Sequence, residues 1–139
     1  MANVGDSRAY VFRPSSSDFV FKTSEQWHWF DCPRQLGTNS PDTPVADAAV
    51  SKIELEDGDI IIMATDGLPD NLWDGEIADI CAEGTNNLAD RLVDAAKKIA
   101  IDPFAESPYM ERGIDEGLSM EGGKYDDISV VTAVFRARR

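Results

Sequence analysis

The chain has 139 residues, of which 42% are apolar, so it is long enough and apolar enough to form a packed domain. Its formal net charge of -13 argues against nucleic acid or an anionic membrane as the main partner. Cys32, Cys81 and a single histidine have the spacing of neither a disulfide framework nor a zinc site, so we expect a reducing, intracellular compartment. The sequence has no run of about 20 apolar residues that could cross a membrane, and its start lacks the layout of a secretory signal.

The start of the chain predicts antiparallel strands joined by tight turns. Residues 1–12 have the pattern of the end of one strand, a turn at Gly5-Asp6 and a second strand. A domain rarely begins inside a hairpin, so we expect the chain to start in the middle of its domain. A turn cluster at 14–18 is expected to lead into a returning strand at 19–22.

The middle of the chain predicts a long loop and a second hairpin. Residues 23–47 show little periodicity and are rich in Pro, Asn, Asp and Gly, which is typical of a functional surface loop. An aromatic cluster at 27–30 (Trp-His-Trp-Phe) lies within this loop. Strands at 50–55 and 60–65 are expected to pair with each other around a turn.

The last part of the chain predicts helices followed by one strand. Helices are expected to begin near Asp74, Asn87 and Ser107-Pro108, because capping residues precede helical segments there. A strand is expected at 128–135. Since strands and helices fall in separate blocks, the sequence predicts an α+β domain with a mainly antiparallel sheet.

A carboxylate follows an apolar strand at the point where residues 59–65 run into Asp66 and Gly67. An unpaired carboxylate at the edge of a core is costly, so it pairs with a base, accepts backbone hydrogen bonds or binds a cation. Asp70 lies four residues beyond Asp66, and both carboxylates can face one point if the segment after Gly67 is helical. An ordinary Asp-Gly turn followed by a helix cap explains this segment equally well.

Further acids lie at the ends of other predicted strands. Asp126 and Asp127 precede the last strand, and Asp6 lies in the first turn. Each could be a solvated turn residue, and Asp6 could pair with Arg8. We expect no basic residue near these acids except Arg8. If the strands are neighbours, the acids form an oxygen-only cluster suited to Mg²⁺ or Mn²⁺.

Carboxylates without histidine match the hydrolysis of a phosphate ester, because paired hydrated cations can activate a bridging water. The sequence contains neither a Gly-rich phosphate-binding loop with lysine nor a Gly-x-Ser-x-Gly elbow. Cys32 lies outside any Cys-x5-Arg loop, and His28 between two tryptophans is expected to pack rather than to act as a base.

Three ordered segments resemble the motifs of one enzyme family. They are residues 2–9 (Ala-Asn-Val-Gly-Asp-Ser-Arg-Ala), 64–71 (Ala-Thr-Asp-Gly-Leu-Pro-Asp-Asn) and 126–131 (Asp-Asp-Ile-Ser-Val-Val). Together they resemble the PPM-type metal-dependent protein phosphatases, the type 2C serine/threonine family. Segments at 24–30 and 122–124 further resemble its compact branch, which is found in mitochondria and chloroplasts.

The resemblance implies an α-β-β-α sandwich, in which two antiparallel sheets are flanked by helices. It also implies hydrolysis of phosphoserine and phosphothreonine in a phosphoprotein substrate by a metal-activated water, with two Mg²⁺ or Mn²⁺ ions and a third in some members. By motif position, Asp66 and Asp126 would bind the paired ions, and Asp70 and Asp6 would bind the third. Gly67 and Asp127 would support these ligands without binding metal.

Two motifs of this family are not found in the sequence: the arginine-containing strand motif that holds phosphate and the Asp-Gly-His-Gly motif that supplies the bridging aspartate. Residues 1–139 are therefore expected to be the C-terminal portion of a catalytic domain, inactive by itself. The branch resemblance implies a mitochondrion or plastid, and we expect no targeting segment within this chain.

Two other classes of protein stay open. An inactive fragment or pseudophosphatase would act as a regulatory module, binding a protein partner through exposed sheet edges and the aromatic cluster at 27–30. A plain acidic cation-binding protein is less well supported, because the sequence lacks an Asp-x-Asp-x-Asp-Gly loop.

Overall fold

The computed structural model describes residues 1–138. Its elements in chain order are β1 (Ala2–Asn3), β2 (Arg8–Arg13), β3 (Asp18–Lys22), β4 (Trp27–Trp29), β5 (Cys32–Pro33), α1 (Pro44–Asp47), β6 (Ala49–Val50), β7 (Ile60–Ala64), α2 (Asp74–Ala82), α3 (Leu88–Ala100), α4 (Pro108–Asp115) and β8 (Val130–Val134). The main sheet has four strands in the order β3-β2-β7-β8, and all its neighbours are antiparallel. Two small sheets pair β1 with β6 and β4 with β5.

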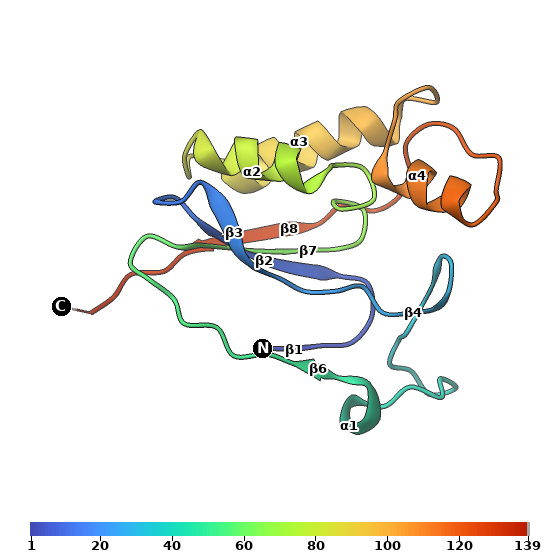
Figure 1. Ribbon diagram of the computed structural model, residues 1–139, viewed down its shortest axis with the longest axis horizontal. Coiled ribbons are helices and arrows are strands. Elements are labelled where there is room, and N and C mark those ends of the chain that lie inside the picture. Colours follow the sequence, from blue (N-terminus) through green and yellow to red (C-terminus); the bar gives the residue numbers. More distant parts are fainter. Residues whose placement is uncertain (139) are drawn as a thin grey trace.

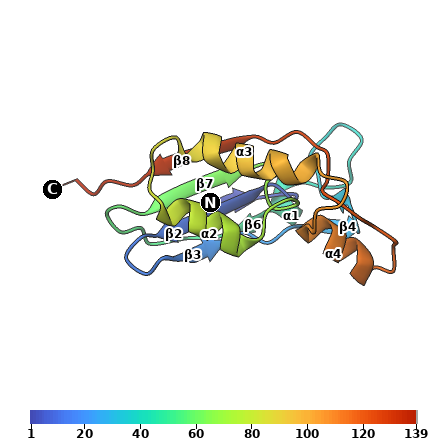
Figure 2. The ribbon, with the colours of Figure 1, turned by 90° about the horizontal axis from the view of Figure 1, so that it is seen from above.

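The core lies between the main sheet and two helices. Helices α2 and α3 lie on one face of this sheet, and the β1–β6 pair lies on its other side (Figures 1 and 2). Alternate residues of the central strands point at the helices, and the buried ones are Tyr10, Phe12, Ile60, Ile62 and Ala64. Helix α3 buries Leu88, Leu92 and Ala96, which recur at helical spacing. The predicted α+β class is confirmed.

Strand β2 is buried on both faces. Tyr10 and Phe12 are 0% exposed on the helix side, while Ala9 and Val11, on the opposite face, are 4% and 2% exposed. Val11 shares a hollow with Ile53 and Leu55 from the segment after β6. A strand enclosed in this way belongs to the middle of a layered domain, since each face must bury its apolar side chains against another layer.

Both predicted hairpins at the sheet centre are wrong. Strand β1 pairs with β6, with Ala2 opposite Val50, and Gly5 at a φ of 103° carries the chain away toward β2. Strand β7 pairs with β2 and β8 rather than with the residues that precede it. The cause is burial: apolar β7 residues gain more from two enclosed neighbours than from one local strand at the surface.

The helices and the outer strands follow the sequence prediction more closely. The β2–β3 hairpin, the three predicted helices and the final strand are confirmed, with small differences at their ends. Helix α2 begins with Asp74 as its first helical residue, so Trp73 and not Asp74 occupies the N-cap position. The loop expected at 23–47 is partly wrong, because it contains the β4–β5 pair and the short helix α1.

Candidate functional site

The register of the main sheet brings three chain segments to one end. Arg8 at the start of β2 lies opposite Ala64 at the end of β7, and Ala64 lies opposite Val130 at the start of β8. The acidic residues that precede β2, follow β7 and precede β8 therefore meet at the same edge of the sheet. We call this region the acidic end, and it contains Asp6, Asp66, Asp70 and Asp126.

The turn after β7 places Asp66 and Asp70 on one side. The Asp70 N–H donates to the Asp66 carbonyl at 2.9 Å, which is the i to i+4 bond of a helical turn, as expected. The Thr65 hydroxyl donates to the Asp127 carbonyl at 3.0 Å and fixes the turn against the segment before β8. A Cβ at Gly67 would lie 2.7 Å from the Asp127 carbonyl oxygen, so only glycine allows this approach.

A lysine ammonium joins the carboxylates of the acidic end. Lys124 Nζ lies 2.8 Å from Asp66 Oδ2, 2.8 Å from Asp70 Oδ2 and 3.3 Å from Asp126 Oδ2. Because both carboxylates contact the same nitrogen atom, Asp66 Oδ2 and Asp126 Oδ2 lie close to each other. Asp31 Oδ1, on the β4–β5 turn, is a fourth contact at 3.1 Å. The expectation that only Arg8 lies near these acids is wrong, because the loop before β8 folds back onto them.

The loop that carries Lys124 is held on both sides. Asn71, 1% exposed, donates to the Lys124 carbonyl at 3.0 Å, and the Lys124 N–H donates to Asn71 Oδ1 at 2.9 Å. The buried Ser107 hydroxyl donates to the Gly122 carbonyl at 2.8 Å. A Cβ at Gly123 would clash with the Ile99 carbonyl oxygen, so the loop packs directly on the end of α3. These contacts fix where the ammonium can reach.

Burial raises the pKa of Asp70. The Asp70 side chain is 2% exposed, and burial raises its pKa to about 6, although Lys124 and Arg112 act in the opposite direction. Burial would lower the pKa of Lys124, but hydrogen bonds to Asp66 and Asp70 outweigh it and raise that pKa. Burial and the nearby Asp66 charge also raise the pKa of Asp6. Asp6 therefore lies within the field of the same cluster.

Aromatic and basic side chains surround the acidic end. Arg112 from α4 pairs with Asp70 and lies over the Trp27 ring, with its guanidinium carbon 5.3 Å from the ring centroid. The Trp27 indole N–H donates to Asp6 Oδ2 at 3.4 Å. Tyr109 donates to Asp31 Oδ2 at 3.1 Å and stacks on Phe30. Trp27 and Phe30 of the aromatic cluster at 27–30 thus pack around the acidic end, while Trp29 is 69% exposed.

Sequence reasoning missed several of these residues. Asp31, Tyr109, Arg112 and the role of Lys124 carry no motif of their own, since their positions depend on how the β4–β5 turn, α4 and the loop before β8 meet. The sequence contains one signal for Lys124: it ends the Gly-Gly-Lys segment at 122–124 and lies two residues before Asp126.

The donor set suits a hard divalent cation, because it consists of carboxylate oxygens. Within residues 1–138, no group of three acid, histidine or cysteine side chains is placed to hold a metal ion by itself. The residues fit part of a metal site and fall short of a complete one. The assignment of Asp66, Asp126, Asp70 and Asp6 as ligands, with Gly67 and Asp127 in support, stays a prediction.

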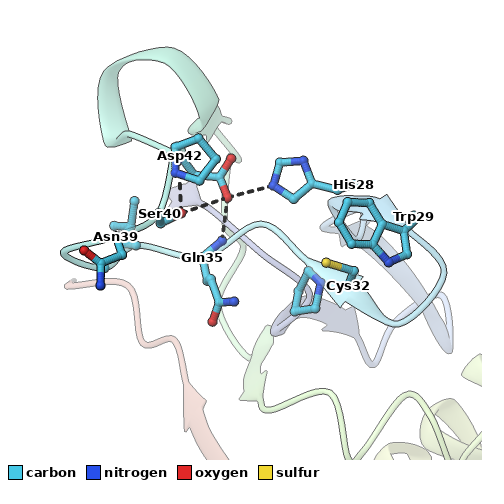
Figure 3. Close-up of a pocket in the computed structure, with 11 residues that line it drawn as sticks. His28, Trp29, Cys32, Gln35, Asn39, Ser40 and Asp42 are labelled. Carbon is cyan, nitrogen blue, oxygen red and sulfur yellow. Dashed lines mark hydrogen bonds and ion pairs between the residues drawn. The ribbon is translucent and has the colours of Figure 1, made fainter.

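A separate open pocket of about 490 Å³ is lined by the β4–β5 pair and by the loop that follows it (Figure 3). On its wall the buried Asp42 carboxylate pairs with His28 Nε2 at 3.0 Å and accepts the Gln35 N–H at 2.9 Å. The hydrogen bond from the Gln35 backbone lowers the pKa of Asp42 most, and the contact with His28 lowers it further. Cys32 lines the same pocket as a free thiol, so neither it nor His28 belongs to the acidic end.

Among the described helices, none combines the length and apolar character required to cross a membrane.

Curated proteins of one family match almost the whole chain. Probable protein phosphatase 2C 1 of Oryza sativa subsp. japonica is 37% identical in an alignment that covers 99% of this chain and 45% of the relative. Protein phosphatase PTC7 homolog of Homo sapiens is 34% identical in an alignment that covers 96% of this chain and 48% of the relative. The chain thus spans about half the length of the curated relatives it matches. No family model matches it.

Solved structures agree with the sequence matches. The X-ray structure of the photosystem II phosphatase PBCP superposes with a TM-score of 0.89 and 32% identity, covering 99% of this chain and 58% of that one. The structure of the S. agalactiae serine/threonine phosphatase has a TM-score of 0.63 at 19% identity, covers 98% of this chain and 53% of that one, and supports the fold alone. Over almost its whole length, the chain is similar to proteins of the protein phosphatase 2C family.

Proposed function

We propose that the chain supplies about half of the active site of a metal-dependent phosphatase that acts on phosphoserine and phosphothreonine in proteins. One observation carries this proposal. Carboxylates from separate motifs, Asp66, Asp70 and Asp126, converge within 3.3 Å of one cationic point. Several carboxylates at one edge of an apolar core are costly in free energy unless a positive charge balances them.

The chain's own residues would bind and position the cations. Asp66 and Asp126 hold the more exposed side of the acidic end, with side chains 25% and 36% exposed, while Asp70 lies beneath them at 2%. Divalent ions bound there would activate water and neutralise phosphate charge. The partly exposed pair is therefore accessible to substrate, and the buried Asp70 suits a supporting place next to the third ion.

The remaining parts of the site would come from outside these residues. The sequence holds neither the phosphate-binding arginine motif nor the Asp-Gly-His-Gly motif of the family. We propose that residues 1–139 form the C-terminal portion of the catalytic domain, and that the other portion supplies both. The branch resemblance favours a phosphoprotein of a mitochondrion or plastid, and one structural relative is named a photosystem II phosphatase.

The test is the loss of activity in an enzyme that carries these residues together with the other half of the domain. We expect Asp66→Asn and Asp126→Asn each to lower kcat by at least about 100-fold, because each removes a ligand that positions charge at the reacting phosphate. Asp79→Asn, on the exposed face of α2, is the matched control and should retain wild-type turnover.

Thermal unfolding distinguishes a lost ligand from a lost fold. Without metal, Asp66→Asn and Asp126→Asn should unfold at the wild-type temperature or slightly above it, since each relieves repulsion within the acidic end. Full activity of Asp66→Asn in a folded enzyme would contradict the assignment.

A non-catalytic, partner-binding role is the second candidate function. Met63 and Val131 are 55% and 66% exposed on the sheet face opposite the helices, and Val50 is 78% exposed on the small sheet. A partner covering this face would bury these apolar side chains. Retention of such a partner by an enzyme inactivated through Asp126→Asn would favour this role.

A further inference from the structure

Lys124 occupies the place that the proposed function assigns to a bound cation. Its ammonium contacts carboxylates from separate segments, at 2.8 Å to Asp66, 2.8 Å to Asp70, 3.1 Å to Asp31 and 3.3 Å to Asp126. The side chain is 16% exposed. A single ammonium has three donors, so its hydrogen-bonding capacity is fully used by this cluster.

The position of the ammonium is built into the fold. Asn71 bonds both backbone groups of Lys124, at 2.9 and 3.0 Å, and Gly123 packs on the Ile99 carbonyl. On the far side, Nζ lies 5.0 Å from the centroid of the Tyr109 ring, within cation-π range. A long lysine side chain loses much conformational entropy when it is held in this way, so the contact needs a compensating electrostatic gain.

We propose that Lys124 is a built-in counter-cation: its ammonium holds the carboxylates of the acidic end together when no divalent metal is bound, and it competes with the metal for the same oxygens. This inference rests on the proposed function, because it takes Asp66 and Asp126 to be metal ligands. It adds a positioning residue from the chain itself, and with it a reason why metal binding would be weaker than the acid count suggests.

The charge balance supports both parts of the proposal. Without Lys124, the carboxylates of Asp31, Asp66, Asp70 and Asp126 would face one another with Arg112 as the cation paired to one of them. Like charges at this separation repel and destabilise the folded state. A divalent ion can replace the ammonium and supply more charge, but it must first displace it, which reduces the apparent metal affinity.

The test compares the variants Lys124→Met and Lys124→Arg with wild type, in the enzyme that carries these residues together with the other half of the domain. The control variant is Lys98→Met, because Lys98 is exposed on α3. Mn²⁺ binding is measured by isothermal titration calorimetry, and thermal unfolding is recorded in EDTA. These substitutions keep the Asn71 bonds, because those bonds use the backbone of residue 124.

We expect Lys124→Met to bind Mn²⁺ at least about tenfold more tightly than wild type, since a competing charge is gone. In EDTA its Tm should fall by about 5 °C, because unpaired partly buried carboxylates remain. Lys124→Arg should recover most of this loss, as the positive charge is kept, and Lys98→Met should change neither quantity.

Two results would overturn the inference and can be told apart. If Asp126→Asn abolishes Mn²⁺ binding while Lys124→Met binds no more tightly than wild type, the proposed metal site stands and the counter-cation role falls. If neither wild type nor Lys124→Met binds Mn²⁺, the metal site itself is wrong, and the inference falls with it.

Discussion

Strand β7 carries an acid at each end, and the two acids have different environments. Asp59, before the strand, is 1% exposed and accepts Arg13 Nε at 3.0 Å and Nη2 at 2.8 Å, a paired bidentate contact. Asp66, after the strand, pairs with no arginine among residues 1–138 and shares the Lys124 ammonium with other acids. Asp59 thus forms a structural ion pair with Arg13. Asp66 belongs to a cluster of acids in which a divalent cation would replace the ammonium.

Arg13→Met should destabilise the protein, and the effect should depend on pH. Hydrogen bonding from Arg13 lowers the pKa of Asp59, so this pair contributes stability above the ordinary carboxyl pKa of about 4, and the contribution is lost as the pH falls through the lowered value. We expect the Tm to fall by about 5 °C at pH 7, because the variant leaves a buried carboxylate unpaired, and the difference from wild type to narrow below about pH 4.

The matched control is Arg136→Met. Arg136 lies 3.9 Å from Asp57 in an exposed pair, so its loss should leave the Tm within about 1 °C at either pH. A difference between Arg13→Met and wild type that grows as the pH falls would show that the Asp59 pair does not act as described.

Asp70→Asn should have a milder effect on catalysis than loss of Asp66 or Asp126. Asp70 is the buried acid beneath the cluster, so it would support the third ion rather than the paired ones. In the enzyme with both halves of the domain, we expect slower turnover and a higher Mn²⁺ requirement, measured as kcat and half-saturating Mn²⁺. Asp90→Asn on α3 serves as the control, and a complete loss of Mn²⁺ binding in Asp70→Asn would place this residue among the primary ligands.

At the scale of elements, helix α4 joins the site to the rest of the domain. Its residues Tyr109 and Arg112 contact Asp31 and Asp70, while its N-cap Ser107 accepts the Met110 N–H at 3.1 Å and donates to the Gly122 carbonyl at 2.8 Å. One hydroxyl therefore begins the helix and anchors the loop that carries Lys124. The position of the ammonium depends on this helix end.

Ser107→Ala should destabilise the protein by about 1–3 kcal/mol in chemical denaturation, because it removes a cap and leaves the buried Gly122 carbonyl without its donor. Hydrogen exchange should also become faster in the loop at 122–124, which the hydroxyl anchors. Ser119→Ala, at an exposed position beyond α4, should have no measurable effect. Unchanged exchange at 122–124 in Ser107→Ala would show that the loop is held by Asn71 alone.

At the scale of the whole molecule, one face of the main sheet is only partly covered. Met63 and Val131 remain exposed opposite the helices, although Ala9 and Val11 on the same face of β2 are buried. The acidic end lies at one edge of this sheet, so a second layer on the open face would extend over both. This arrangement agrees with relatives about twice as long as the chain.

The 139-residue chain by itself should be inactive. It lacks the phosphate-holding and bridging motifs, and orientation with charge stabilisation supplies most of the rate enhancement in such a site. We expect no Mn²⁺-dependent hydrolysis of p-nitrophenyl phosphate, and we expect the exposed face to make the chain self-associate in size-exclusion chromatography. Metal-dependent turnover by a cooperatively unfolding monomer would show that the site is complete within these residues.

The α+β class, the helices and the acids at strand ends could be predicted from the sequence, because each has a local signal: apolar periodicity, a capping residue, or an acid beside a strand end. The strand partners and the contact of Lys124 with the acids depend on tertiary packing. Strand β7 pairs with two strands that are distant in the chain, because these neighbours enclose its apolar residues. This burial outweighs the local preference for a hairpin at the turn at 56–59. Lys124 reaches Asp66 across 58 residues through a folded loop, a contact that no local pattern encodes.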